Sequence, residues 1–245
     1  MVSFIVIEYH SIEEIKGFIC SLDHATSGLD YEIIISSNSQ YSKEEQTEIL
    51  SFFPKIVWTF NERNGGFAYG MNEGLKVAKG DILAVVNPDV KIRSSLAPMI
   101  NYLESNSKVG IVAPKIIDAE GIIQDSFRHF VTPWGFFVRQ VGWIKDKGKL
   151  HEKNFQEPVY GDWVIGAFMV CRRFFYEKVG GLSDDYFMYC EDMDWCKRAH
   201  LAGYEVVYFP ETVVEYKGTR SARHSWKYAK IHIRSLLTYW RKYGF

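Results

Sequence analysis

The sequence predicts an α/β domain with a mostly parallel, doubly wound sheet. Continuous apolar runs such as Val2–Ile7 and Ile82–Val86 are typical of strands that helices cover on both faces. Between such runs, segments such as Ile12–Leu22 carry apolar residues at helical spacing. Because strands and helices alternate along the chain, we expect the strands to run parallel to one another.

The first ninety residues repeat this alternation in a regular order. Ser11 precedes the first helix, where a small polar residue often marks a helix start, and Gly80 follows the third, where helices commonly end. The expected strands are Val2–Ile7, Tyr31–Ile35, Lys55–Phe60 and Ile82–Val86, and the expected helices are Ile12–Leu22, Glu44–Phe53 and Gly66–Ala78.

The pattern becomes less regular after residue 90. Residues 127–160 are irregular and aromatic, and a long loop of this kind in a compact domain is often a binding element. Helices are expected at Ser94–Glu104, Arg173–Val179 and Asp192–Ala202, and strands at Gly110–Ile117, Gly121–Gln124, Ala167–Arg172 and Glu205–Phe209.

Composition limits the classes of function. The 245 residues carry a formal net charge of −1, so the overall charge does not favour nucleic acid as a partner. The four cysteines form no CxxC pair, which argues against a zinc site and for free thiols in a reducing cytoplasm. No window approaches the roughly 18 apolar residues of a membrane span. The N-terminus also lacks the basic start of a signal peptide, so we expect a cytoplasmic protein.

A glycine-rich turn, a helix and a buried strand lead to one carboxylate. The turn is Asn64-Gly65-Gly66, and the carboxylate is that of Asp89. Ligands of open α/β sheets bind outside the carboxyl ends of strands, where an aspartate suits a divalent cation and the diphosphate that the cation binds. The plain alternative is that Asp89 is a turn residue after Pro88 and that the glycines form an ordinary loop.

An acidic cluster, Glu191, Asp192 and Asp194, follows an aromatic run. Acids stabilise the start of a helix, which accounts for one or two of them. A carboxylate that the aromatic run partly buries would have a raised pKa and could serve as a general base. The residues alone leave both interpretations open.

The segment from Lys217 onward contains eight Lys or Arg residues and no acid, interleaved with aromatic and aliphatic side chains. The first interpretation is an amphipathic helix packed on the domain. The second is a segment that lies on an anionic membrane surface. Nucleic acid is the third and least favoured partner, given the nearly neutral chain.

Taken together, the motifs resemble those of the family 2 glycosyltransferases, inverting enzymes with a GT-A fold. They are most similar to the rhamnosyltransferase-like branch that builds bacterial surface polysaccharides. The resemblance spans Met1 to Gly218 and rests on the order and spacing of short motifs. These are N-G-G-F-A at Asn64–Ala68 with Asn72 and Gly74 beyond it, A-x-G-D at Ala78–Asp81, N-P-D at Asn87–Asp89, G-A-F-M at Gly166–Met169, V-G-G-L at Val179–Leu182, F-M-Y-x-E-D-x-D-W at Phe187–Trp195 and A-G-Y-x-V at Ala202–Val206.

The resemblance implies a role for each matching residue. Asp89 takes the place of the metal-binding carboxylate, which contacts the cation on the donor diphosphate. Asp192 matches the general base that deprotonates the acceptor hydroxyl, with Glu191 and Asp194 beside it as further catalytic residues. The residues expected to bind the nucleotide sugar are Tyr9, Ser37, Asn64, Gly65, Gly66, Asn72, Asn87 and Asp89.

The resemblance also implies an organisation and an activity. A GT-A domain at 1–216 would consist of a nucleotide-binding half up to residue 90 and an acceptor half from residue 91, followed by a basic helical tail at 217–245. The enzyme would move a sugar from a dTDP- or UDP-linked donor to a hydroxyl of a glycan or lipid-linked acceptor, with inversion and with Mn²⁺ or Mg²⁺. The enzyme would be cytoplasmic, an oligomer is compatible with this scheme, and peripheral contact with the inner face of the cell membrane stays open through the basic tail.

Three positions depart from the family pattern. Ser36-Ser37-Asn38 stands where the family often has a base-reading aspartate, Glu8-Tyr9-His10 ends the first strand, and Glu215-Tyr216-Lys217 stands where many members have a histidine. These departures leave open the alternative that the protein is a module that binds a nucleotide sugar without transferring it. Further alternatives are a glycoside hydrolase that uses Asp89 and Asp192 as a carboxylate pair, and an adaptor whose basic tail binds membrane or nucleic acid.

Overall fold

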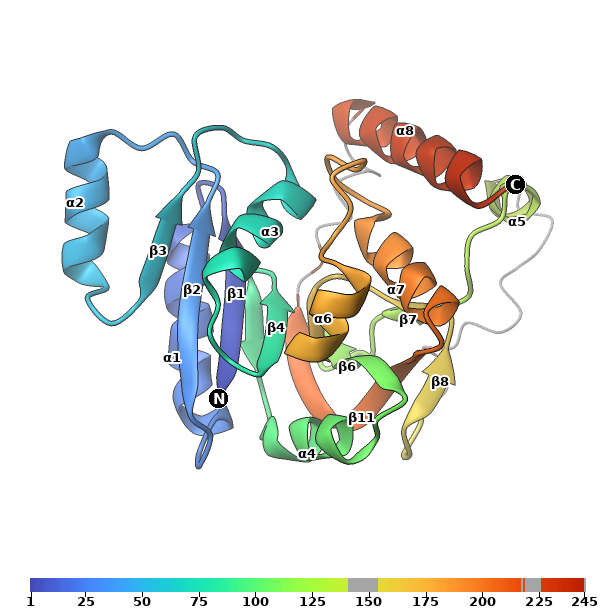
Figure 1. The fold of residues 1–245 in the computed structure, drawn as a ribbon, viewed down its shortest axis with the longest axis horizontal. Coiled ribbons are helices and arrows are strands. Elements are labelled where there is room, and N and C mark those ends of the chain that lie inside the picture. Colours follow the sequence, from blue (N-terminus) through green and yellow to red (C-terminus); the bar gives the residue numbers. More distant parts are fainter. Residues whose placement is uncertain (141–153, 217, 219–225, 245) are drawn as a thin grey trace.

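A central sheet separates two layers of helices (Figure 1). The structure is a computed structural model that describes residues 1–140, 154–216, 218 and 226–244. Over these residues the strands are β1 (Val2–Glu8), β2 (Tyr31–Ser37), β3 (Val57–Phe60), β4 (Ile82–Val86), β5 (Val90–Ile92), β6 (Val109–Ile117), β7 (Phe127–Arg128), β8 (Val159–Gly161), β9 (Trp163–Val164), β10 (Phe168–Arg172) and β11 (Glu205–Tyr216). The helices are α1 (Ile12–Ala25), α2 (Lys43–Phe52), α3 (Phe67–Val77), α4 (Ala97–Ser105), α5 (Pro133–Gln140), α6 (Arg173–Val179), α7 (Glu191–Leu201) and α8 (Trp226–Tyr243).

The main sheet is mostly parallel, as the alternation of strands and helices predicts. Within the described residues it has nine strands in the order β3-β2-β1-β4-β10-β6-β11-β5, with β8 also paired to β11. Strands β3, β2, β1 and β4 are parallel neighbours. Strand β10 runs antiparallel to both β4 and β6, whereas β11 lies parallel to β6. Strand β10 is therefore the seam at which the first half of the chain meets the second.

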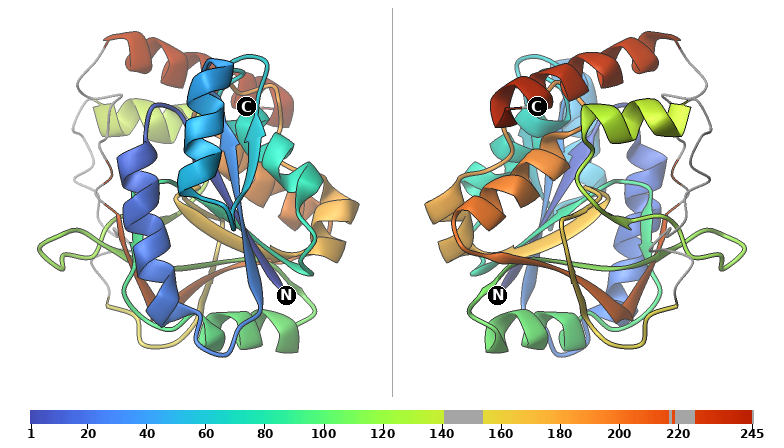
Figure 2. Two further views of the ribbon diagram at one scale, coloured as in Figure 1. Left: turned by 90° about the vertical axis from the view of Figure 1, so that its left-hand side faces the viewer. Right: turned by 90° about the vertical axis from the view of Figure 1, so that its right-hand side faces the viewer.

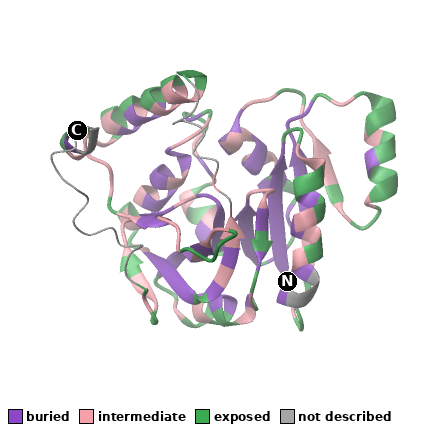
Figure 3. Cartoon of the chain, turned by 180° about the vertical axis from the view of Figure 1, so that it is seen from behind, coloured by how far each residue is buried: buried purple, intermediate pink, exposed green. Residues whose placement is uncertain are grey.

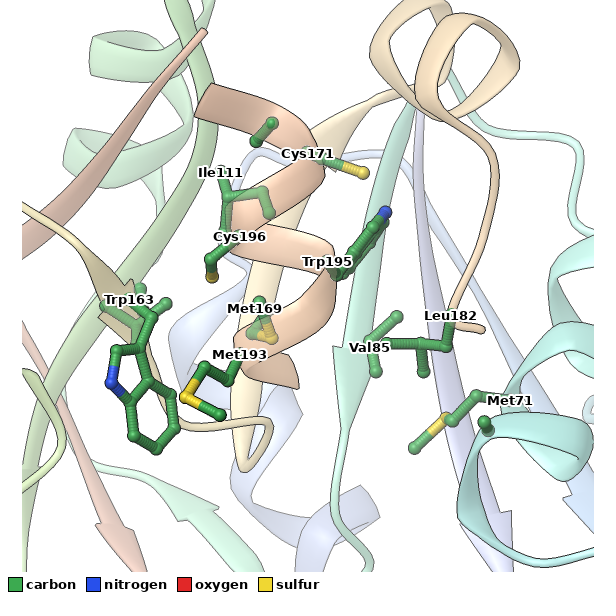
Figure 4. Packing of buried hydrophobic residues seen from close by; sticks show 14 of the residues in the cluster. Met71, Val85, Ile111, Trp163, Met169, Cys171, Leu182, Met193, Trp195 and Cys196 are labelled. Carbon is green, nitrogen blue, oxygen red and sulfur yellow. The ribbon is translucent and has the colours of Figure 1, made fainter. Parts of the chain in front are cut away.

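Buried clusters on both faces hold the helices to the sheet. One cluster joins Phe18 of α1 to the strands, and the other joins Met71 of α3 and Trp195 of α7 to the opposite face. Figure 3 shows the central strands as buried and α2 as largely exposed. Figure 4 shows side chains of α7 and β10, among them Met193 and Met169, in one packed layer.

The second half holds the main departures from the predicted elements. The strand predicted at Gly121–Gln124 is wrong, because Ile123 makes only an isolated bridge with Ile117. The stretch at 127–160, predicted to be irregular, contains β7, α5 and β8. Its residues 141–153 lie outside the described part of the chain.

The last strand continues past its predicted end at Phe209 as far as Tyr216. A register shift between Phe209 and Val213 accommodates Pro210, which cannot donate a hydrogen bond to a neighbouring strand. After the shift, β11 pairs with β5, a strand that the sequence analysis does not predict. This pairing places Tyr216 opposite Val90, one residue beyond Asp89.

The C-terminal segment forms helix α8, which packs on the second half of the domain (Figures 1 and 2). The indole N–H of Trp240 donates to the carbonyl of Val131 at 2.7 Å, and the hydroxyl of Ser235 donates to the carbonyl of Met188 at 2.8 Å. The predicted C-terminal helix is thus confirmed for Trp226–Tyr243, while 217 and 219–225 lie outside the described residues. Among the described helices, none is both long and apolar enough to cross a membrane.

Candidate active site

Asp89 lies in the turn between β4 and β5, at the carboxyl end of the buried strand β4. Asn87 starts this turn. Its backbone N–H donates to the carbonyl of Ala167 at 2.9 Å, and its Nδ2 donates to the hydroxyl of Tyr216 at 3.1 Å. Within the described residues, the buried Oδ1 of Asn87 has no hydrogen-bond partner. Because an unpaired buried oxygen costs free energy, a ligand or cation beside Asp89 would satisfy it.

Asp89 and Asn87 can offer two oxygens to a cation. Over the described chain, no group of three His, Cys, Asp or Glu side chains could hold a metal ion by itself. However, Mg²⁺ usually binds one or two protein carboxylates and completes its shell with waters and substrate phosphates. The pair therefore fits a cation that arrives with a diphosphate. Burial raises the pKa of the Asp89 carboxyl, and a bound cation would favour its charged form.

Asp192 lies in the first turn of α7, where two main-chain donors hold its carboxylate. Its Oδ2 accepts from the N–H of Gly166 at 2.8 Å, and its Oδ1 accepts from the N–H of Met193 at 2.7 Å. Burial raises the pKa of Asp192, while these two N–H groups and then the charge of Arg128 oppose the rise. A carboxylate with a raised pKa is a better proton acceptor near neutral pH.

Two consecutive residues connect Asp192 to the Asn-Pro-Asp turn. Gly166 donates to Asp192, and the carbonyl of the next residue, Ala167, accepts from the N–H of Asn87. Tyr216 lies close to both carboxylates. Burial and then the charge of Asp89 raise the pKa of its hydroxyl to about 12, and Asp192 adds to this effect. The fold thus brings Asp89 and Asp192 to one edge of the sheet.

The two acids that flank Asp192 have different surroundings. Glu191 is buried, and its Oε2 has no hydrogen-bond partner in the described structure. Burial, followed by the charge of Asp192, raises the pKa of Glu191 well above its usual range. Asp194 is fully buried, and its oxygens accept from Nε of Arg198 at 2.8 Å and from the hydroxyl of Tyr243 at 2.9 Å. The contacts of Asp194 are therefore those of a residue that holds α8 on α7.

The glycine-rich turn contacts the segment that precedes α7. Gly66 has a φ of 91°, and a Cβ atom there would lie 2.0 Å from the carbonyl oxygen of Phe187. The N–H of Phe67 donates to that oxygen at 2.8 Å. Asn64 shapes the turn, because its Oδ1 accepts from the N–H of Gly66 at 3.0 Å. Residue 66 must be glycine because the two backbones touch at this point.

Asn72, on α3, holds the same segment from a second position. Its Oδ1 accepts from the N–H of Leu182 at 3.0 Å, and its Nδ2 donates to the carbonyl of Leu182 at 2.7 Å. Both the oxygen and the nitrogen of the Asn72 side chain are therefore engaged in hydrogen bonds within the protein. Asn72 therefore positions the segment between α6 and α7 relative to α3.

The ends of β1 and β2 carry Tyr9 and Ser37, together with an acid that the sequence analysis noted only as a departure. Glu8 is fully buried; its Oε2 accepts from the hydroxyl of Ser37 at 2.5 Å, and its Oε1 accepts from the hydroxyl of Tyr41 at 3.0 Å. Tyr9 is exposed, with its ring 4.7 Å from that of His10. Glu8 thus fixes the strand ends, and Tyr9 is the side chain free to meet a ligand there.

A cavity of about 380 Å³ lies beside this site, between the start of α3, the segment before α7 and helix α8. Neither Asp89 nor Asp192 lines it. Its walls are formed by Arg63, Gly65, Tyr69, Asp184, Asp185, Phe187, Ile231, Arg234, Ser235 and Thr238.

The order of the strands in the main sheet is that of the GT-A fold. A solved structure of GalNAc-T7 with UDP, GalNAc and Mn²⁺ has this fold: it superposes with a TM-score of 0.65 at 15% identity, over 88% of this chain and 43% of that one. The chain belongs to glycosyl transferase family 2, whose family model matches residues 3–192. It is therefore an inverting glycosyltransferase of glycan biosynthesis.

Its curated relatives include rhamnosyltransferases. The chain is 27% identical to rhamnosyltransferase WbbL of Escherichia coli over 216 residues, which cover 86% of this chain and 81% of the relative. It is also 27% identical to N-acetylglucosaminyl-diphospho-decaprenol L-rhamnosyltransferase of Mycobacterium tuberculosis over 252 aligned positions, covering 94% of this chain and 81% of the relative. The rhamnosyltransferase-like resemblance is confirmed by these two proteins.

Proposed function

We propose that this enzyme moves a hexose from a dTDP- or UDP-linked donor to a hydroxyl of a lipid-linked glycan acceptor, in the synthesis of a bacterial surface polysaccharide. The observation that carries this proposal is the connection between the Asn-Pro-Asp turn and Asp192 through Gly166 and Ala167. It sets a cation-binding carboxylate and a proton acceptor at one edge of the sheet, as a single displacement requires. The relative that acts on a diphospho-decaprenol acceptor supports the lipid-linked substrate.

The proton acceptor in this scheme is Asp192. Its carboxylate already accepts from Gly166 and Met193, which fixes its orientation. Remaining lone pairs can accept the proton of the acceptor hydroxyl as that oxygen attacks the anomeric carbon of the donor. Buried Glu191 lies directly before it and keeps its own proton more firmly, so that the negative charge stays on Asp192.

Asp89 and the Oδ1 of Asn87 would hold a divalent cation. The cation supplies Lewis-acid stabilisation to the departing nucleoside diphosphate. Tyr216 accepts a hydrogen bond from Asn87 and thereby keeps the Asn87 amide turned in one orientation. Its own hydroxyl proton remains available to a diphosphate oxygen.

The nucleotide would occupy the strand ends of the half before residue 91. Tyr9 supplies an exposed ring for the base, while Ser37 acts through Glu8. Asn64, Gly65 and Gly66 supply the turn at the start of α3, whose N-terminus favours an anion. The half from residue 91 to 216 would bind the acceptor.

The outward face of α8 would contact the membrane surface. Three large apolar side chains alternate there with cations, and the helix contains no acid. The residues proposed to contact the membrane are Trp226, Lys227, Lys230, Ile233 and Leu237, all of which are exposed. Helix α5 lies beside α8 in both views of Figure 2 and exposes Trp134 and Phe137. Such a basic and aromatic face suits an anionic bilayer surface.

Thermal melting with nucleoside diphosphates and their sugars, with and without Mn²⁺, tests the donor site. A ligand that binds the native state raises the melting temperature by mass action. We expect a cation-dependent rise with one base, and its loss in Asp89→Asn. The exposed Asp81 offers a matched control, Asp81→Asn, which should respond like the native protein. No rise with any nucleotide would overturn the proposal.

A further inference from the structure

The cavity between α3 and α8 is lined by two arginines that have no carboxylate partner among the described residues. In the described structure, the guanidinium of Arg63 lies 4.9 Å over the ring of Tyr69 and has no carboxylate partner. Arg234, on α8, likewise has no ion pair or hydrogen bond with a described residue. Both line the same cavity from different elements. Two unpaired guanidiniums that face one space form a site for an anion with several oxygens.

The acids in this cavity already have partners. Asp185 pairs with Nζ of Lys242 at 3.3 Å and accepts from the hydroxyl of Ser183 at 2.9 Å. Asp184 accepts from Nδ2 of Asn72 at 3.1 Å. Two guanidiniums therefore face one carboxylate that lacks a cation, so the cavity has an excess of positive charge.

The other walls are apolar, and the cavity lies next to the reaction centre. Tyr69, Phe187 and Ile231 supply the apolar surface. Phe187 is the residue whose carbonyl meets Phe67 and the glycine-rich turn, and it lies four residues before Glu191. A volume of about 380 Å³ falls in the usual range of small-molecule sites. An anionic group bound here, with an apolar chain attached, would leave its sugar within reach of α7.

We infer that this cavity binds the diphosphate of the lipid-linked acceptor, with Arg63 and Arg234 as its ligands and the lipid leaving along α8. The inference rests on the proposed function for the identity of the acceptor. The donor diphosphate has its own position at Asp89, which does not line the cavity. The lipid exit follows from α8, because the helix that contributes Arg234 also carries the exposed apolar residues Ile233 and Leu237.

Farnesyl diphosphate, a short prenyl diphosphate, is the probe for this site. Its affinity for the full chain is measured by calorimetry, beside that of farnesol, which lacks the diphosphate. The variants are Arg63→Gln, Arg234→Gln and the double variant. Arg241→Gln removes an exposed cation from the same helix outside the cavity and serves as the matched control. Thermal melting without ligand establishes that each variant is folded.

We expect the native protein to bind farnesyl diphosphate and not farnesol. Each cavity variant should lose about tenfold in affinity, the loss of one charge-assisted hydrogen bond, while Arg241→Gln keeps the native value. The affinity for nucleoside diphosphate with Mn²⁺ should not change. An unchanged affinity for farnesyl diphosphate in the double variant would overturn the inference. An equal loss of nucleotide affinity would instead assign the arginines to the donor. Failure of the proposed function is distinct, because the native protein would then bind no nucleotide.

Discussion

The backbone N–H of Gly166 donates a hydrogen bond of 2.8 Å to the carboxylate of Asp192, and a Cβ atom at Gly166 would lie 3.3 Å from the Cβ of Asp192. The strand β10 that starts just after Gly166 also pairs with β4, which leads to Asp89. The helix that carries the proposed base is thereby fixed relative to the strand that leads to the proposed cation ligand. The proposed displacement needs this fixed arrangement more than it needs either carboxylate alone.

Replacing Asp192 by Asn should remove most of the turnover. The amide keeps the shape but cannot accept a proton, so kcat should fall about 10²- to 10⁴-fold. Steady-state kinetics and nucleotide binding check this together. Nucleotide affinity should stay at the native value, and Asp81→Asn should leave both quantities unchanged. A parallel loss of nucleotide affinity would argue against the role of general base.

The pH dependence of the native enzyme should reflect the raised pKa of Asp192. A general base must be deprotonated to act, so activity falls as the pH falls through its pKa. Because burial raises that pKa, the acid limb of kcat/KM should lie above the range of an ordinary aspartate. A profile that stays flat down to the ordinary carboxylate range would contradict this.

Tyr216→Phe tests whether the hydrogen bond between Tyr216 and Asn87 matters apart from the packing of the Tyr216 ring. The variant keeps the ring but removes the oxygen that accepts from Nδ2 of Asn87. We expect a loss of about 1–3 kcal/mol in the free energy of unfolding, the cost of an unpaired buried donor, and a higher KM for the donor. Tyr102→Phe, which removes a hydroxyl pair near the surface, is the control. A native KM would remove Tyr216 from the donor site.

The raised pKa of Glu191 should make the protein less stable as the pH rises. The folded pKa of Glu191 lies well above the unfolded value of 4.5, so the native state binds more protons between the two. Stability should therefore decrease as the pH rises above about 4.5 and towards the folded value. Glu191→Gln, which mimics the protonated form, should lose this part of the slope. Urea unfolding of both proteins between pH 5 and 8 measures the difference, and identical slopes would contradict the prediction.

Asp194 offers a test between a catalytic and a structural role. Asp194→Asn leaves Arg198 without its buried partner and weakens the bond from Tyr243, so we expect a loss of about 3–5 kcal/mol of stability. Turnover per folded molecule should stay close to native. Asp185→Asn, at an exposed partner of Lys242, should cost less than about 1 kcal/mol. Lost turnover at native stability would support the predicted catalytic role of Asp194.

The regular half of the fold could be predicted from sequence because its signals are local. The apolar run Ile82–Val86 and the helical spacing of the segments around it depend only on neighbouring residues. The second half could not be predicted so well. Strand β5 has three residues and exists because β11 resumes after the shift at Pro210, a contact that no local pattern contains.

The candidate site shows the same limit. Asp89 and Asp192 could be found because motifs mark them, and the structure places both at one sheet edge. Glu8 and Tyr216 carry weaker signals, since each is a single residue at the end of a strand. The partners of Asn72 and Asp194 lie in the segment before α7 and on α8, so only the fold shows that these side chains serve to position other elements.

The outward face of α8 should bind anionic vesicles. Lys227 and Lys230 are exposed on it, and a cation near an anionic surface contributes about 1 kcal/mol. The double variant Lys227→Gln/Lys230→Gln should therefore bind vesicles containing phosphatidylglycerol roughly 30-fold more weakly. Vesicle sedimentation measures this, with pure phosphatidylcholine vesicles as the uncharged reference. The exposed Lys16 and Lys43 lie on α1 and α2, and their double change to Gln removes the same charge from a different face. Because both double variants have the same net charge, an equal loss in the two would show attraction to the whole protein rather than binding by α8.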